Sequence, residues 1–136
     1  MCELAEYFNS RSGIEVIMIT LGKTDKFYIV PPGVFLYEPA FVFNSNLRFL
    51  YTLKTIFYLR KTIRNIKPVA VLSFGETYNS FVLLSTLLLR RRVFVSDRSK
   101  PNKKWGNFHE TLRRLLYPKA AGIICQTKYS SAFMVA

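Results

Sequence analysis

The sequence has few of the side chains that hold metal ions or form disulfide bonds. Its 136 residues include two cysteines, Cys2 and Cys125, and one histidine, His109. Two cysteines are too few for a disulfide framework, so we expect buried free thiols in a reducing compartment. With a single histidine they make no zinc site either, and His109 is expected at a capping or surface position. We expect no metal and no cofactor.

Glycine-rich motifs that bind phosphates are also missing. None of the six glycines falls in a GxGxxG, GxxxxGK[ST] or GxSxG pattern. These patterns mark dinucleotide-binding turns, P-loops and hydrolase nucleophiles. The eight acidic residues show no spacing typical of a glycosidase pair or a metal cluster. The sequence therefore assigns no catalytic residue.

No hydrophobic run is long enough to cross a bilayer. The most apolar segment, FVLLSTLLL at 81–89, is about half as long as a spanning helix. The opening MCELAEYFNS contains two glutamates and no basic residue, unlike a signal peptide. We expect a cytoplasmic protein, with peripheral contact to the inner face of the cell membrane as a further expectation.

Acidic residues are scarce, and the positive charge is unevenly distributed. Residues 1–46 hold three basic and five acidic residues, a net charge of −2. Residues 47–136 hold 17 basic and three acidic residues, a net charge of +14. A basic surface of this size indicates an anionic partner, which is a phosphate ligand, a nucleic acid or an anionic lipid. For any single charge, a solvated surface position is the simpler explanation.

The hydrophobic pattern alternates between helices and strands. We predict helices over 2–11, 47–66, 77–89, 108–117 and 128–136, and strands over 14–20, 26–30, 69–74, 93–96 and 122–127. Residues 34–46 look irregular, and Asn46 is the predicted N-cap of the long helix. Several strands are apolar throughout, as in sheets that helices cover on both faces. The length and this order predict one α/β domain over 1–136, with a doubly wound, mostly parallel, Rossmann-like sheet.

The two ends differ from those of a complete domain of this kind. Such domains normally begin with a strand and a phosphate-binding turn. This sequence opens on a predicted helix and closes inside another one. We therefore expect a partial domain that is truncated at both ends and lacks its first strand.

Open α/β sheets bind ligands beyond the carboxyl ends of their strands. That rule selects three loops of this chain. The candidate ligand-binding residues are Gly75, Glu76, Thr77, Ser96, Asp97, Arg98 and Lys100, and Trp105, Gln126 and Thr127 are the candidate edge of the cleft.

Each of these side chains has a structural and a functional interpretation. Gly75 can adopt a positive φ or let a ligand approach the backbone. Glu76 can bind sugar hydroxyls, act as a general base, or interact with a helix N-terminus. Arg98 can bind a phosphate or form an ion pair with Asp97 or Glu76. Trp105 can stack on a sugar ring or cover the sheet edge.

The predicted helix at 47–66 is a second candidate region. It and the following Lys67 hold six basic residues and no acidic one. Basic helices with large apolar side chains can lie on anionic membranes. We expect this helix mainly to pack on the sheet, with its basic groups reaching water.

Three segments in a fixed order resemble a known family. They are LSFGETYNSFVLLSTLL, VFVSDRSKP and LRRLLYPKAAGIICQT. Their order is similar to that in the N-terminal domain of glycosyltransferase family 4, the retaining enzymes of the GT-B fold. Many members carry SFG, then SERxxP, then RxLYPxAD and a strand ending in QT. Here Asp97 stands where many members have glutamate, and Arg98 and Pro101 are kept.

The resemblance implies the acceptor-binding half of a two-domain enzyme. Such an enzyme transfers a sugar from a nucleotide-sugar to a lipid-linked or surface glycan. The expected acceptor is a glycan or a polyprenyl-diphosphate-linked sugar, and the nucleotide-sugar binds a C-terminal domain with a Glu-x7-Glu motif. That motif is not in this sequence, so we expect the chain alone to be inactive.

Two other classes remain open. One is a basic α/β module that binds nucleic acid, although the sequence has no RNP, KH or helix-turn-helix signature. The other is a non-functional gene remnant, which would leave an apolar sheet edge exposed.

Overall fold

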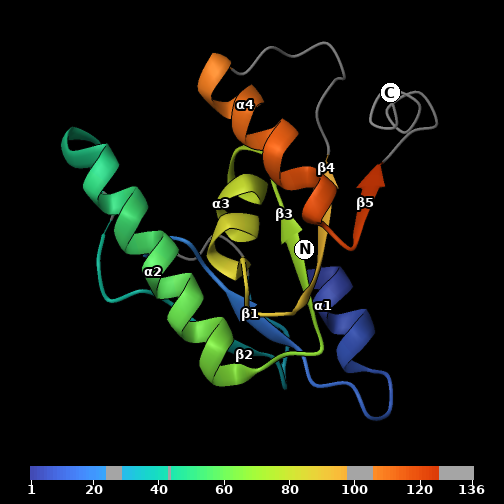
Figure 1. Cartoon of the computed structure of the whole chain (residues 1–136). Coiled ribbons are helices and arrows are strands. Elements are labelled where there is room, and N and C mark those ends of the chain that lie inside the picture. The colour runs from blue at the N-terminus through green and yellow to red at the C-terminus, as the bar shows by residue number, and fades with distance from the viewer. Residues whose placement is uncertain (24–28, 43, 98–105, 126–136) are drawn as a thin grey trace. The chain divides into compact units, whose positions relative to one another are not determined.

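The computed structural model describes residues 1–23, 29–42, 44–97 and 106–125 (Figure 1). This part of the chain is an α/β structure with four α-helices and two small parallel sheets. Its contacts divide it into two compact units, Met1–Tyr58 and Leu59–Ala136. The mostly parallel α/β class predicted from the sequence is confirmed, whereas the described strands form two sheets rather than one.

The first unit contains one helix, two short strands and the start of a long helix. These are α1 (Cys2–Asn9), β1 (Ile17–Ile19), β2 (Phe35–Tyr37), the 3-10 turn η1 (Ser45–Leu47) and the first half of α2 (Arg48–Ile66). β1 and β2 are parallel, with Ile17 opposite Phe35. The ladder continues beyond the strand end, where the amide of Thr20 donates to the carbonyl of Tyr37 at 3.0 Å.

Two sequence predictions in this unit are wrong. β2 lies in the stretch 34–46, which was predicted to have no regular secondary structure. Asn46 does not cap the long helix with its side chain; instead, its amide donates to Oδ1 of Asn44 at 2.9 Å, at the start of η1. A strand of three residues is fixed by its pairing with a neighbour, so local periodicity does not reveal it. Of the strand predicted at 26–30, residues 26–28 lie outside the described part, and Ile29 and Val30 are not in a strand.

Helix α2 is confirmed almost as predicted. Its 19 residues include no glycine or proline, the two residues that most disfavour a helix interior. It ends at Ile66, and Lys67 then takes a left-handed conformation with a φ of 53° before Pro68. No helix in the described part of the chain is long and apolar enough to span a bilayer.

The second unit holds the elements that position the candidate site. They are β3 (Ala70–Phe74), α3 (Glu76–Thr86), β4 (Arg92–Asp97), α4 (Asn107–Leu116), the 3-10 turn η2 (Tyr117–Lys119) and β5 (Gly122–Cys125). The strand order is β3-β4-β5, and both pairs are parallel. α3 contacts β3, β4 and α4. All five elements of regular structure predicted between residues 69 and 125 are confirmed to within a few residues, and the helix predicted at 128–136 lies outside the described part.

The core of this unit is built from side chains of α2, α3, β4, α4 and η2. Its buried apolar side chains are Leu59, Ile63, Val82, Leu83, Val93, Val95, Leu116 and Tyr117. Val95, at the centre of the middle strand, has no exposed surface. Gly122 faces Phe94 in the β4–β5 register, and a Cβ on Gly122 would lie 3.0 Å from the Phe94 ring. A larger residue at this point would require the Phe94 ring to shift by a few tenths of an ångström.

Arg60 in the second half of α2 caps the carboxyl end of α3. Its guanidinium donates to the backbone carbonyls of Ser85 at 3.1 Å and Leu87 at 2.8 Å. The last carbonyls of a helix have no partner within the helix, and a cation there also interacts favourably with the helix dipole. This contact fixes where α3 ends and where the turn into β4 begins.

Candidate functional site

The predicted loops leave the three-stranded sheet at one edge. Phe74 is opposite Ser96 in the β3–β4 ladder, and Asp97 is opposite Cys125 in the β4–β5 ladder. The three strands therefore end side by side at their carboxyl termini. We call this the carboxyl edge, and it includes Gly75 directly after β3 and the last residues of β4.

Part of the predicted site falls within the described chain. Gly75 precedes α3, Glu76 and Thr77 are its first two residues, and Ser96 and Asp97 are the last two residues of β4. The structure thus brings the backbones of these five residues to one edge. The remaining predicted site residues lie outside the described part; they are Arg98, Lys100, Trp105, Gln126 and Thr127.

Gly75 makes the sharp turn from β3 into α3. Its φ of 97° and ψ of 122° lie in a region that L side chains rarely adopt. Its carbonyl accepts the first hydrogen bonds of the helix, from the amides of Tyr78 at 3.0 Å and Asn79 at 2.8 Å. A Cβ at Gly75 would lie 3.4 Å from the Tyr78 ring, an ordinary contact. Glycine is therefore needed for its backbone conformation rather than for space, as the sequence predicted.

A buried hydrogen-bond network lies directly beneath the carboxyl edge. The Ser73 hydroxyl donates to Oδ1 of Asn79 at 2.7 Å. Nδ2 of Asn79 donates to the carbonyl of Ser96 at 3.1 Å and to the Tyr117 hydroxyl at 3.3 Å. Asn79 has no exposed surface, so its amide needs these partners. The network joins β3, β4, α3 and η2 at the point where both loops begin.

Ser96 is buried at the end of β4. It is 4% exposed, and its carbonyl accepts a hydrogen bond from Nδ2 of Asn79. Ser96 therefore takes part in the network beneath the edge, and the ligand contact predicted for it stays a prediction.

Sequence reasoning missed Asn79 and Tyr117. One signal was available, since Asn79 lies within the mostly apolar segment 77–89, where a polar amide must find buried partners. Tyr117 is part of LRRLLYP, but its contact with Asn79 spans 38 residues of sequence and depends on the register of the strands.

Two polar side chains early in α4, Glu110 and His109, have structural partners. Glu110 lies 3.5 Å from the guanidinium of Arg113, one turn along the helix. The His109 ring packs edge-on against Phe81, with 6.1 Å between the ring centroids. The sequence predicted a capping or surface position for His109. It is the third residue of α4, whose N-cap is Gly106, and it is half-buried, so the prediction of a surface position is only partly correct.

No metal centre is found in the described part of the chain. No group of three histidine, cysteine, aspartate or glutamate side chains lies together there. Cys2 and Cys125 form no disulfide bond and are half-buried, so the burial predicted for them is only partial. No family model matches the sequence, and a search of curated proteins finds no significant match.

Proposed function

We propose that the chain is the acceptor-binding half of a glycosyltransferase similar to family 4. In this proposal the sheet is one half of a Rossmann-like, doubly wound GT-B enzyme. The complete enzyme transfers a sugar from a nucleotide-sugar to a lipid-linked or surface glycan at the cytoplasmic face of the membrane. The order of the three sequence segments supports the class, and the geometry of the carboxyl edge supports the site.

One structural observation carries the proposal. β3 and β4 end in register, and Asn79 holds both strand ends through Ser73 and the carbonyl of Ser96. Binding residues act best when rigid elements and buried hydrogen bonds fix their positions. The network provides such a base for the loops that begin at Gly75 and after Asp97.

The residues at this edge suit a sugar linked to a diphosphate. Gly75 lets a ligand approach the backbone, and the carboxylates of Glu76 and Asp97 accept hydrogen bonds from sugar hydroxyls. Arg98 and Lys100 supply positive charge for the phosphates. We propose Trp105, Gln126 and Thr127, which follow the strands in sequence, as the edge of the cleft.

Catalysis in the complete enzyme then rests on positioning and on charge stabilisation. When the acceptor is held in the reactive geometry beside the donor, the reaction no longer depends on a chance bimolecular encounter, and its barrier is lower. Basic groups stabilise the charge that develops on the leaving diphosphate of the donor. The donor binds the other half of the enzyme, so the chain alone binds acceptor without transferring sugar.

Binding of a soluble short-chain polyprenyl-diphosphate sugar tests the proposal. Titration calorimetry compares the wild-type chain with the double variant Glu76→Gln/Asp97→Asn and with a control, Glu3→Gln/Glu6→Gln, that neutralises two exposed carboxylates of α1. We expect at least tenfold weaker binding for the first variant and no change for the control. Equal affinities, or sugar transfer by the chain alone, would overturn the proposal.

A basic nucleic-acid-binding module is the second candidate, and one observation favours it. Residues 59–136 hold fifteen basic and three acidic residues. Any protein so charged binds DNA or RNA with an affinity that falls steeply with salt. The deciding property is therefore a preference among nucleic acids. A competition assay at constant salt, with RNA and DNA of different sequence and strandedness, should show at least a tenfold difference in affinity if the chain is such a module.

A further inference from the structure

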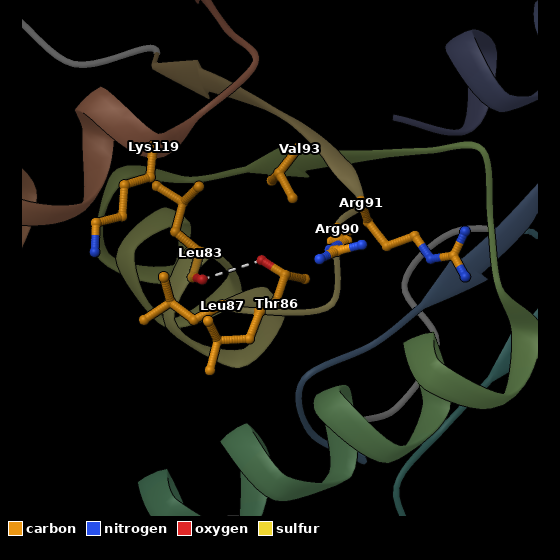
Figure 2. Close-up of a pocket in the computed structure, with 8 residues that line it drawn as sticks. Leu83, Thr86, Leu87, Arg90, Arg91, Val93 and Lys119 are labelled. Carbon is orange, nitrogen blue, oxygen red and sulfur yellow. Dashed lines mark hydrogen bonds between the residues drawn. The ribbon is translucent and has the colours of Figure 1, made fainter.

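A pocket of about 240 Å³ lies in the second unit, away from the carboxyl edge (Figure 2). It is lined by Leu83, Thr86, Leu87, Leu88, Arg90, Arg91, Val93 and Lys119. These residues come from the last turn of α3, the turn into β4, the start of β4 and the end of η2. Since α3 begins at the carboxyl edge and ends here, the pocket lies at the amino edge of the sheet.

The pocket combines an apolar lining with unpaired positive charge. Arg90, Arg91 and Lys119 line it, and none of its lining residues is acidic. In Figure 2, Arg90 lies close to Thr86 and Val93, whereas the Lys119 side chain extends away from Arg90 beyond Leu83, and the guanidinium of Arg91 points away from the pocket. Arg90 is therefore the cation set most directly beside the pocket, and Arg91 and Lys119 add to the positive potential around it.

Neighbouring groups do not offset this charge. In the described part of the second unit, the carboxylate of Glu110 pairs with Arg113 on α4, and neither residue lines the pocket. Arg60 adds another cation, because its guanidinium binds the carbonyl of Leu87, a lining residue. The Thr86 hydroxyl is engaged with the carbonyls of Val82 and Leu83. Recognition of an anion therefore depends on the cations rather than on this hydroxyl.

The turn that carries Arg90 has an unfavourable backbone. Leu88 has a φ of 67° and Arg90 a φ of 51°, a left-handed region that is costly for residues other than glycine. Leu88 is 91% exposed, so burial of its side chain does not compensate for this conformation. Strained backbone that packing does not explain is concentrated at ligand sites. Here it holds Arg90 beside the pocket.

We propose that this pocket binds a phosphate group that carries an apolar substituent. Arginine and lysine bind phosphate oxygens through charge-assisted hydrogen bonds, and Leu83, Leu87 and Val93 offer an apolar surface to the substituent. Pockets for drug-sized ligands measure about 300–1,000 Å³. The smaller volume here suits one phosphate with a short apolar segment, either a free phosphate monoester or the headgroup of a lipid. This site is independent of the acceptor proposal, which concerns the opposite edge.

The full chain is titrated with three probes at constant ionic strength. They are inorganic phosphate, butyl phosphate, and phosphatidylcholine vesicles with and without phosphatidic acid. The double variant Arg90→Gln/Lys119→Gln removes two of the cations that line the pocket. The control Arg48→Gln/Arg114→Gln removes the same charge from exposed positions that do not line it. Far-UV circular dichroism checks that both variants are folded.

We expect butyl phosphate to bind more tightly than inorganic phosphate, because the apolar lining adds contact. The pocket variant should lose at least tenfold in affinity, and the control should change less than threefold. If only the phosphatidic acid vesicles bind, and the Arg90→Gln/Lys119→Gln variant weakens that binding, the ligand is a lipid headgroup. Equal losses in both variants would show a diffuse basic surface and overturn the proposal, as would failure of all three probes to bind the wild-type chain.

Discussion

Replacement of Asn79 by alanine should strongly destabilise the second unit. Asn79 is completely buried and makes hydrogen bonds of 2.7 Å to Ser73, 3.1 Å to the carbonyl of Ser96 and 3.3 Å to the Tyr117 hydroxyl. Alanine removes all three contacts and leaves a small cavity between β3, β4 and α3.

The magnitude follows from the groups that lose a partner. A buried polar group left without a hydrogen bond costs about 1–3 kcal/mol. The Ser73 hydroxyl is 5% exposed and the Ser96 carbonyl belongs to a residue that is 4% exposed, so water replaces Asn79 poorly. The Ser96 carbonyl also belongs to a paired strand, which limits its share of the loss. We expect the free energy of unfolding to fall by about 3 kcal/mol in total, out of about 5–15 kcal/mol for a typical domain.

Urea unfolding followed by circular dichroism measures this change. The matched control is Asn65→Ala, which makes the same substitution at an exposed position in helix α2. Alanine is a better helix former than asparagine, so the control should change stability by less than about 0.5 kcal/mol. A double-mutant cycle between Asn79→Ala and Ser73→Ala should show a coupling of about 1 kcal/mol. Equal effects of the two asparagine substitutions, or no coupling with Ser73, would refute the network.

Three further substitutions test the turns around the sheet. Arg60→Gln should lower stability by about 1–2 kcal/mol in urea unfolding, because it removes charged hydrogen bonds to the carbonyls of Ser85 and Leu87; an unchanged midpoint would contradict this capping role. Leu88→Gly should raise the free energy of unfolding by about 1 kcal/mol, because the exposed Leu88 has a left-handed backbone conformation that glycine adopts without strain. A lower thermal midpoint for this variant would contradict the strain at Leu88. Gly75→Ala should lower stability by about 2 kcal/mol through its φ of 97°, and a stabilised variant would show that the turn conformation is different.

The long helix and the strands of the three-stranded sheet could be predicted from the sequence. A continuous apolar run such as 69–74, bounded by Pro68 and Gly75, indicates a strand, and β3 lies there. Such a run also predicts burial on both faces, but in the described chain Ala70 and Leu72 of β3 are exposed. β2 could not be predicted, because three residues carry too little periodicity and the parallel pairing with β1 fixes them. The N-cap was misplaced for a similar reason, since asparagines at both 44 and 46 satisfy the local rule.

The candidate site was predictable only as a location. The rule for open α/β sheets pointed to the loops after residues 74 and 96, and the aligned strand ends agree with it. The Asn79–Tyr117 contact was not predictable, because it joins residues far apart in sequence and requires the final packing of α3. The pocket at the amino edge was also missed. Three consecutive arginines at 90–92 are visible in the sequence, but the cavity depends on the left-handed turn before them.

The most direct test of the central claim is an NMR titration of the full chain with a short-chain polyprenyl-diphosphate sugar. The account predicts saturable shifts of the Gly75, Glu76 and Asp97 amides, at the edge where β3 and β4 end in register. Butyl phosphate should shift the amides around Arg90 and Lys119 without the same changes at Gly75. Saturating acceptor analogue that leaves the Gly75, Glu76 and Asp97 amides unchanged would contradict the assignment of the carboxyl edge as the acceptor site.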